Sequence, residues 1–186
     1  GRDSLGAGAT LNTNDNLILR SDANGTARLA IVTSPATTTI NGKVTVERYI
    51  PMGLTYDSRR WRLITAPFKT ATAPSIQAAW QEGTFCPDRT NPSAYDPKPG
   101  YGTHVTVANV AVNGFDQGSQ NNPSIFHYSK AVPSNWRAPI SSTGIKVTDS
   151  LGVYMLFIRG DRSIVIVNQF VAAKPTTLDP KGELYL

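Results

Sequence analysis

The side chains that could perform nucleophilic catalysis are few in this sequence. Such catalysis needs a serine or cysteine beside a histidine and a carboxylate. The chain has only two histidines, His104 and His127, and no G-x-S-x-G segment. Its single cysteine, Cys86, precedes a proline, so we expect a small buried or loop thiol that forms no disulfide within the chain. The sequence therefore predicts neither a hydrolytic triad nor a reactive thiol.

Carboxylates could instead supply acid–base chemistry. Glycoside hydrolysis needs two positioned carboxylates. The glutamates are only Glu47, Glu82 and Glu183, and most aspartates fall in predicted turns, where their side chains cap the backbone. A catalytic pair hidden among the aspartates, in a lyase or a hydrolase, stays open as an alternative. We predict a chain without enzyme activity.

Metal-binding patterns are weak. A Ca²⁺ loop needs several oxygen ligands close together, and the one candidate is Asp116 with Gln117, Asn121 and Asn122. No histidines or cysteines cluster at the spacing of metal ligands. We therefore predict no metal site and no cofactor.

Aromatic residues are the remaining candidates for binding. Four rings lie in or beside predicted loops: Trp136, Tyr101, Tyr95 and Tyr128. Sugar rings stack on exposed aromatic faces, while Asn, Asp and Arg side chains hydrogen-bond the hydroxyl groups. We take these four residues as the candidate ligand-binding residues. The alternative is that they only cover the ends of the fold.

The tripeptide Arg159-Gly160-Asp161 has the sequence that integrins bind. Recognition by a cell receptor is one interpretation. The simpler interpretation is a glycine bend whose flanking charges keep a hairpin tip in solvent, and we favour it.

The elements that would position these residues are organised around the stretch 42–67. Residues 44–50 and 59–66 are two β-prone runs with period-2 alternation, separated by a loop-like segment. We expect them to form a central hairpin. The two runs hold four arginines but only one acid, Glu47. We expect Glu47 to pair with one of these arginines across the hairpin, because burying a guanidinium without a partner costs much free energy. The runs could be a scaffold with a solvated charged face or a ligand-facing platform of arginines and aromatic rings, with the arginine stems lying on Trp61 or Tyr49. The charged residues concerned are Arg48, Arg59, Arg60, Arg62 and Glu47.

The rest of the chain predicts an antiparallel all-β fold. Three Asn-Gly pairs lie at 24–25, 41–42 and 113–114 between β-prone runs, and Asn-Gly is a strong hairpin signal. Further strands are expected at 16–20, 27–32, 103–107, 109–112, 124–128 and 164–167. The run 151–158 is apolar on both faces, so we expect a central strand covered on both sides.

One short helix is expected between Ser75 and Gly83. Ser75 is a plausible N-cap, and Ile76, Ala79 and Trp80 fall on one face. We expect Trp80 to anchor this helix to the sheet. Together these elements predict a single domain over residues 1–186, an antiparallel β-sandwich of jelly-roll-like type with one short helix.

Composition restricts the classes of partner. The chain has 186 residues, 40% hydrophobic and 17% charged, with a net charge of +5 and a pI near 9.5. The basic residues are scattered rather than clustered in a stripe, so we predict no nucleic-acid binding. The longest apolar run, 151–158, is too short for a membrane helix, and we predict no direct membrane insertion.

Several motifs, taken in order, resemble a segment of large secreted and surface proteins of the Bacteroidetes, which are often adhesin-like and exported by the type IX secretion system. The resemblance covers residues 17–186 and rests on VTVERYIP (44–51), RRWRLITAP (59–67), SIQAAWQEG (75–83), PGYGTHVT (99–106), GFD (114–116), SIFHY (124–128), NW (135–136) and LFIRGDRS (156–163). It implies an extracellular or cell-surface location and an internal piece of a longer multi-domain protein. It implies no ligand and no reaction.

These observations predict a non-catalytic extracellular module that serves adhesion or a structural role. The alternative is a carbohydrate-binding module attached to a polysaccharide-degrading enzyme. The expected partner is a polysaccharide or another surface protein. Exposed, coplanar rings of Trp136 and Tyr101 beside a groove would favour the carbohydrate-binding module, whereas a cleft with converging acids would favour an enzyme.

Overall fold

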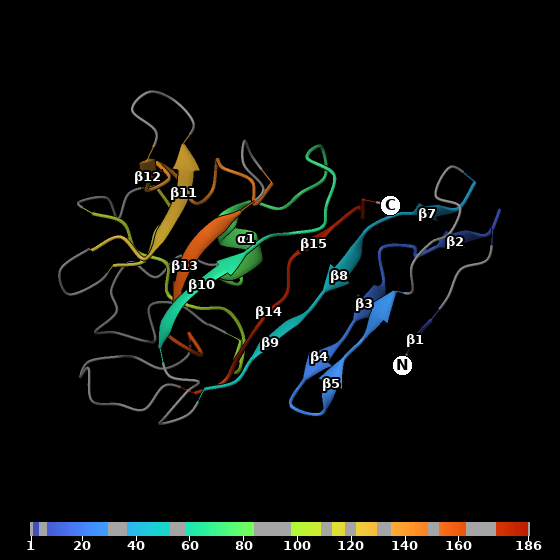
Figure 1. The fold of residues 1–186 in the computed structure, drawn as a ribbon, viewed down its shortest axis with the longest axis horizontal. Coiled ribbons are helices and arrows are strands. Elements are labelled where there is room, and N and C mark those ends of the chain that lie inside the picture. Colours follow the sequence, from blue (N-terminus) through green and yellow to red (C-terminus); the bar gives the residue numbers. More distant parts are fainter. Residues whose placement is uncertain are drawn as a thin grey trace.

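The computed structural model describes residues 2–3, 7–29, 37–52, 59–83, 98–108, 113–117, 122–129, 135–148, 153–162 and 174–185 (Figure 1). In these described residues the fold is all-β and sandwich-like, with several mostly antiparallel sheets and one short helix, as the sequence predicts. The expected strands at 109–112 and 164–167, together with Cys86, lie outside the described residues.

The largest sheet has four antiparallel strands in the order β10, β13, β11, β12. Their bounds are Arg60–Ile64, Tyr154–Ile158, Ile125–Ser129 and Asn135–Arg137. Strand β13 is central, as expected for the run 151–158, and its residues alternate between buried and half-buried. Tyr154, Leu156 and Ile158 are fully buried, whereas Met155 and Phe157 on the opposite face are only half-buried. The expectation that both faces would be covered is therefore wrong for this strand.

The inner face of this sheet packs on helix α1 (Ile76–Trp80). Ser75 caps the helix by accepting a hydrogen bond from the backbone N–H of Ala78. The buried Trp80 meets Tyr154 of β13 edge to face, with ring centroids 5.3 Å apart. Strands β10 and β13 cross in front of α1 in Figure 1. The predicted helix, its cap and the anchoring role of Trp80 are all confirmed.

The run 44–50 does not pair with 59–66. Its strands β8 (Val44–Val46) and β9 (Arg48–Ile50) pair antiparallel with β15 (Lys181–Gly182) and β14 (Thr176–Leu178), in one continuous register. Strand β10 pairs with β13 instead. The predicted central hairpin is therefore wrong, because each run finds its partner at least 90 residues away. Alternation predicts the two faces of a strand but not its neighbour.

The N-terminal segment contains parallel pairs, which the antiparallel expectation missed. Strand β1 (Arg2–Asp3) pairs with β6 (Arg28–Leu29), and β2 (Thr10–Asn12) pairs with β7 (Thr39–Asn41). Strand β3 (Leu17–Leu19) pairs with β8. Parallel strands need a long connection, and the chain between β3 and β7 supplies one.

That connection includes the predicted Asn-Gly hairpin. Strands β4 (Ser21–Asp22) and β5 (Gly25–Thr26) pair across it. Asp22 Oδ1 accepts from the backbone N–H groups of Asn24 and Gly25, as turn aspartates commonly do. At Asn41-Gly42, by contrast, the chain turns between strands that pair elsewhere. Gly42 has a φ of 91°, and a Cβ there would lie 2.5 Å from Thr13 Oγ1.

The expected strand 103–107 is not a strand, although every residue from 102 to 107 is buried. Its backbone N–H and C=O groups form hydrogen bonds with loops and side chains and not with the backbone of a neighbouring strand. Val105 N donates to Asp116 Oδ2, and Thr106 N donates to Ser124 Oγ. Buried polar backbone must find partners, and here turns and side chains provide them.

The segment 159–162 lies in the interior and not at a solvated tip. Arg159 donates to the backbone oxygen of His104, and the buried Asp161 accepts from Gly100 N. Arg162 is fully buried and pairs with Asp116, which is equally inaccessible. Arg162 also donates to the backbone oxygen of Gln81 at the end of α1. Our favoured interpretation of the Arg-Gly-Asp string as a solvated tip is therefore wrong.

Removing one partner of the Arg162–Asp116 pair should strongly destabilise the fold. We expect Arg162→Met to lower the free energy of unfolding by about 3–5 kcal/mol, because Asp116 is left charged and buried. Chemical denaturation followed by far-UV circular dichroism measures this loss. The matched control is Arg28→Met on the exposed part of β6, which should stay within about 0.5 kcal/mol of wild type. Equal losses in the two variants would contradict the structure.

Candidate functional site

The outer face of the four-stranded sheet carries a group of aromatic side chains, here called the aromatic face. Period-2 alternation and the pairing of Trp61 with Phe157 and of Tyr128 with Trp136 place these rings on the side away from α1. Its members are Trp61, Phe126, Tyr128, Trp136 and Phe157. The face thus crosses all four strands of the sheet.

The rings of this face contact one another. Trp61 packs against Phe126 and Phe157, with centroids 5.5 Å and 5.3 Å apart. Tyr128 meets Trp136 edge to face at 5.6 Å and 73°. Yet Trp61, Trp136 and Tyr128 keep 42%, 41% and 39% of their surface exposed. Packing fixes the rings in place while solvent still reaches them.

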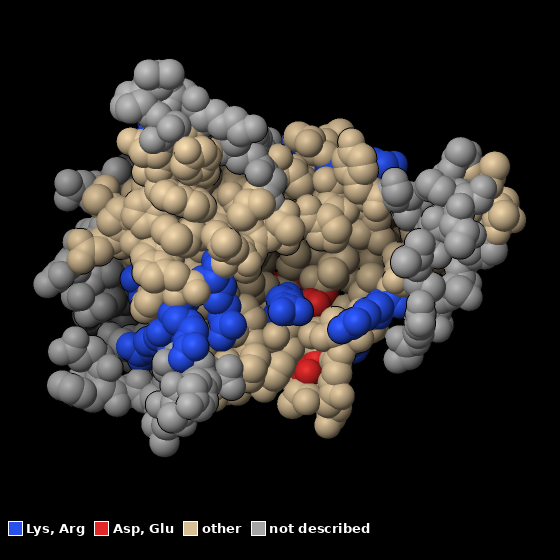
Figure 2. Space-filling model, in the orientation of Figure 1, with Lys and Arg blue, Asp and Glu red and all other residues tan. Residues whose placement is uncertain are grey.

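Arginines border the aromatic face at one end of the sheet. The guanidinium of Arg159 lies 5.4 Å from the Phe157 centroid, a cation–π distance. The register of β10 and β13, continued by one residue, brings Arg59 opposite Arg159. Burial lowers the pKa of Arg59. Figure 2 shows basic side chains gathered near this end of a largely uncharged surface.

The predicted site residues do not form one site. Trp136 and Tyr128 lie together on the aromatic face. Tyr101 lies elsewhere, where its backbone forms a β-bridge to Thr177. Lys98 Nζ lies 3.3 Å from the centroid of the Tyr101 ring, and the Tyr101 hydroxyl donates to the carboxylate of Glu47. The coplanar Trp136–Tyr101 platform is therefore absent. Tyr95 lies outside the described residues.

Sequence reasoning missed Phe126 and Phe157 as binding candidates, and it considered Trp61 only as part of a possible platform on the run 59–66. The signal that could have found them is alternation, because each of these three rings occupies the parity opposite the buried residues of its own strand or run. Trp61 alternates with Ile64 and Ala66, and Phe126 follows the fully buried Ile125. Only the strand order, however, shows that these rings meet.

Glu47 is buried and serves the structure. Its carboxylate accepts from Ser21 N at 3.0 Å and lies 3.6 Å from Arg20. It does not pair with any of the arginines of 48–62, so the predicted ion pair across a hairpin is wrong. The partner is Arg20 because β8 and β9 lie beside the segment of β3 and β4.

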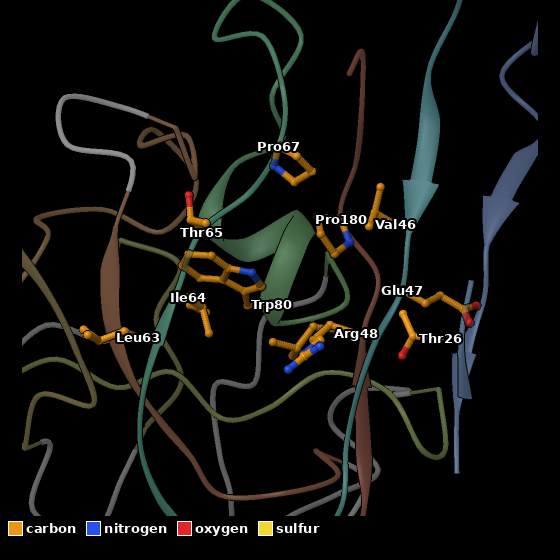
Figure 3. Close-up of a pocket in the computed structure, with 11 residues that line it drawn as sticks. Thr26, Val46, Glu47, Arg48, Leu63, Ile64, Thr65, Pro67, Trp80 and Pro180 are labelled. Atoms are coloured by element: carbon orange, nitrogen blue, oxygen red, sulfur yellow. The ribbon is translucent and has the colours of Figure 1, made fainter. Parts of the chain in front are cut away.

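A pocket opens between β9 and β10 (Figure 3). Its volume is about 330 Å³, and Trp80 lies among its lining residues. Most of the lining is apolar, contributed by Val46, Leu63, Ile64, Pro67, Leu178 and Pro180. Thr26, Thr65, Glu47 and Arg48 complete it. Leu63 of β10 lies beside the aromatic face and is 67% exposed.

The weak Ca²⁺ candidate is not organised for metal binding in the part that is described. Asp116 bonds Arg162 and Val105 N, so its oxygens serve the fold. Among the described residues, no three His, Cys, Asp or Glu side chains form a group that could hold a metal ion. In the same residues, no helix is long and apolar enough to cross a bilayer.

Two acids lie beside Lys98, and burial raises the pKa of both. Burial raises the pKa of Glu82 to about 8, although the positive charge of Arg162 and a hydrogen bond from Lys98 N oppose the shift. Burial also raises the pKa of Asp179, which lies 3.8 Å from Lys98 Nζ. Glu82 holds the loop at 98–102 to the end of α1, and Asp179 holds it to the segment between β14 and β15.

Glu82 should make the fold less stable as pH rises. Its folded pKa of about 8 exceeds the ordinary value of 4.5, so the folded state binds the proton more tightly. The resulting stabilisation is complete below about pH 4.5 and is lost by about pH 8. Relative to Glu82→Gln, wild type should therefore lose stability between pH 5 and pH 9, measured by urea denaturation at each pH.

The control for this experiment is Glu183→Gln, which removes a carboxylate paired with Lys69 at the surface. Its stability difference from wild type should show no such fall. A Glu82→Gln difference that stays constant from pH 5 to pH 9 would contradict the burial of this carboxyl group.

Comparison with known proteins adds no relative. The chain matches no family model, no curated protein and no solved structure. The resemblance carried by its motifs stays a prediction, and function has to be argued from the geometry.

Proposed function

We propose that this chain is a non-catalytic adhesion module of a secreted or cell-surface protein, and that it binds through the aromatic face. The observation that carries the proposal is a contiguous group of rings, three of them about 40% exposed, on one open side of the sheet. Large exposed apolar groups on a folded domain mark interaction surfaces.

The composition of this face supports a protein partner. Aromatic residues, methionine and arginine are enriched in protein interfaces, whereas acidic residues and lysine are depleted. The outward positions of the four strands hold five rings together with Leu63, Met155 and the bordering Arg159. None of the outward positions carries a carboxylate. The partner we propose is a protein surface with an apolar centre and an acidic margin.

The fixed rings support binding with little entropic cost. Trp61 is held by Phe126 and Phe157, and Tyr128 is held by Trp136. Ordering of side chains on association weakens affinity. Rings that are already ordered in the free protein avoid most of that loss.

The engaged acids support the non-catalytic part of the proposal. Three buried carboxylates, those of Glu47, Asp116 and Asp161, each accept a backbone N–H. A general acid or base must face its substrate, whereas these carboxylates are held by hydrogen bonds within the fold. Burial lowers the pKa of His127, with Arg137 acting in the same direction, which favours a neutral imidazole.

Carbohydrate binding is the second candidate, because Trp136 and Tyr128 are exposed. Their planes meet at 73°, so the two rings cannot stack together on one flat sugar chain. One ring could still stack on a single sugar. This geometry favours the protein partner over the polysaccharide.

Arrays of extracellular proteins and of glycans, probed with the same labelled chain, test the proposal. We expect binding to acidic protein surfaces that weakens as salt is raised. Trp61→Ala and Trp136→Ala should each weaken that binding about 30-fold, as loss of an aromatic hot spot worth about 2 kcal/mol does.

The matched control is Tyr185→Ala, which removes a ring that is 73% exposed but belongs to the C-terminal segment and not to the aromatic face. It should bind as wild type does. Binding to glycans alone, lost in Trp136→Ala, would replace the proposal with the carbohydrate candidate. Absence of binding on both arrays would refute adhesion and leave a structural role.

A further inference from the structure

The pocket between β9 and β10 has the features of a separate ligand site. Its volume of about 330 Å³ falls at the lower end of the range for small-molecule sites, about 300–1,000 Å³. Such sites are mostly apolar with a few polar groups that orient the ligand. Here Leu178, Ile64 and Val46 supply apolar wall, and Trp80 lies deeper, where it is only 2% exposed.

The charges at this pocket are unbalanced. Glu47 lines it, but its carboxylate is held by Ser21 N and Arg20 on the side of β4. Figure 3 shows Arg48 reaching from β9 toward β10 while Glu47 extends the opposite way. Within the described residues, the Arg48 guanidinium has neither an ion pair nor a hydrogen bond. An unneutralised cation therefore faces an apolar pocket.

A second arginine, Arg62, lies on β10 two residues before Ile64, a residue that lines the pocket. The two side chains share one side of the strand. The Nε and Nη2 atoms of Arg62 are buried and have no hydrogen-bond partner in the described part of the chain. Buried N–H groups left without hydrogen-bond partners destabilise a fold. An anion near this end of the pocket would compensate for that cost.

We propose that this pocket binds an aliphatic carboxylate, with its carbon chain against Trp80, Ile64 and Leu178 and its carboxylate beside Arg48 and Arg62. Arginine binds carboxylates through paired N–H groups. The apolar lining rejects a strongly hydrated ion that lacks a carbon chain. The same chemistry could come from a free acid or from the C-terminus of a peptide that ends in an apolar residue.

Isothermal titration calorimetry of the full chain tests this assignment. The probes are octanoate, 1-octanol, which has the chain without the charge, and acetate, which has the charge without the chain. A short peptide ending in leucine, with a free or an amidated C-terminus, distinguishes the two sources. We expect octanoate to bind at least about 10-fold more tightly than either partial probe, as loss of a charged hydrogen bond predicts.

Variants place the ligand in the pocket. Arg48→Gln should weaken octanoate binding about 10-fold and leave the fold intact, because Arg48 is exposed. Arg62→Met should weaken octanoate binding and raise the melting temperature of the ligand-free chain, because it removes two buried guanidinium nitrogens that have no hydrogen-bond partner among the described residues. Arg28→Gln, at an exposed position on β6, is the control and should bind as wild type does.

Three results would overturn the proposal. One is failure of octanoate and of the free-carboxylate peptide to bind wild type. A second is equal octanoate binding by wild type, Arg48→Gln and Arg62→Met, which would place any ligand elsewhere. Tight binding of 1-octanol equal to that of octanoate would also refute it, because the carboxylate would then contribute nothing.

Discussion

The buried ion pair between Arg162 and Asp116 joins segments that are far apart in the chain. Arg162 follows β13 and also bonds the backbone oxygen of Gln81 at the end of α1. Asp116 accepts from Val105 N in the buried segment 102–107. Water is excluded from both charged groups, so any shift of one segment would leave a charge without compensation. This pair therefore fixes the layer on which the inner face of the sheet rests.

Neighbouring residues extend the same constraint toward the surface. Asp161 accepts from Gly100 N, and Arg159 reaches the backbone oxygen of His104 while its guanidinium covers Phe157. The chain thus passes from a buried charge to an aromatic ring within a few residues. Fixing the inner layer of the sheet also fixes the positions of the rings on the outer side. The open aromatic face is stable because the other side of the sheet is tied down.

Local patterns in the sequence predicted the elements whose structure depends on local chemistry. The cap at Ser75, the buried face of α1, the turn at Asn24-Gly25 and the central position of β13 all follow from spacing and residue type. Strand partners did not follow. The run 44–50 pairs with 176–182, and nothing in either segment specifies the other, because alternation alone is compatible with many neighbours.

The same limit explains the errors at the candidate site. By sequence alone, the Arg-Gly-Asp segment resembles a solvated hairpin tip. In the fold, distant residues bury it: Gly100 N donates to Asp161, and Asp116 pairs with the neighbouring Arg162. Trp136 and Tyr128 could be selected as exposed rings, but Trp61 and Phe126 could not be joined to them without the order of the strands. Tyr101 was selected for its loop, and its ring is covered by Lys98. Side-chain type limits the chemistry that is possible, and tertiary contacts decide which of it is available.

The four-stranded sheet packs on α1 by one face and leaves the other face open to solvent. Hydroxyl-radical footprinting, read residue by residue by mass spectrometry, measures this directly on the intact chain. Trp61, Trp136 and Tyr128, about 40% exposed, should be oxidised much faster than Trp80, which is 2% exposed, and Tyr154, which is fully buried. Protection of Trp61 and Trp136 equal to that of Trp80 would show that the outer face is covered and would contradict the account.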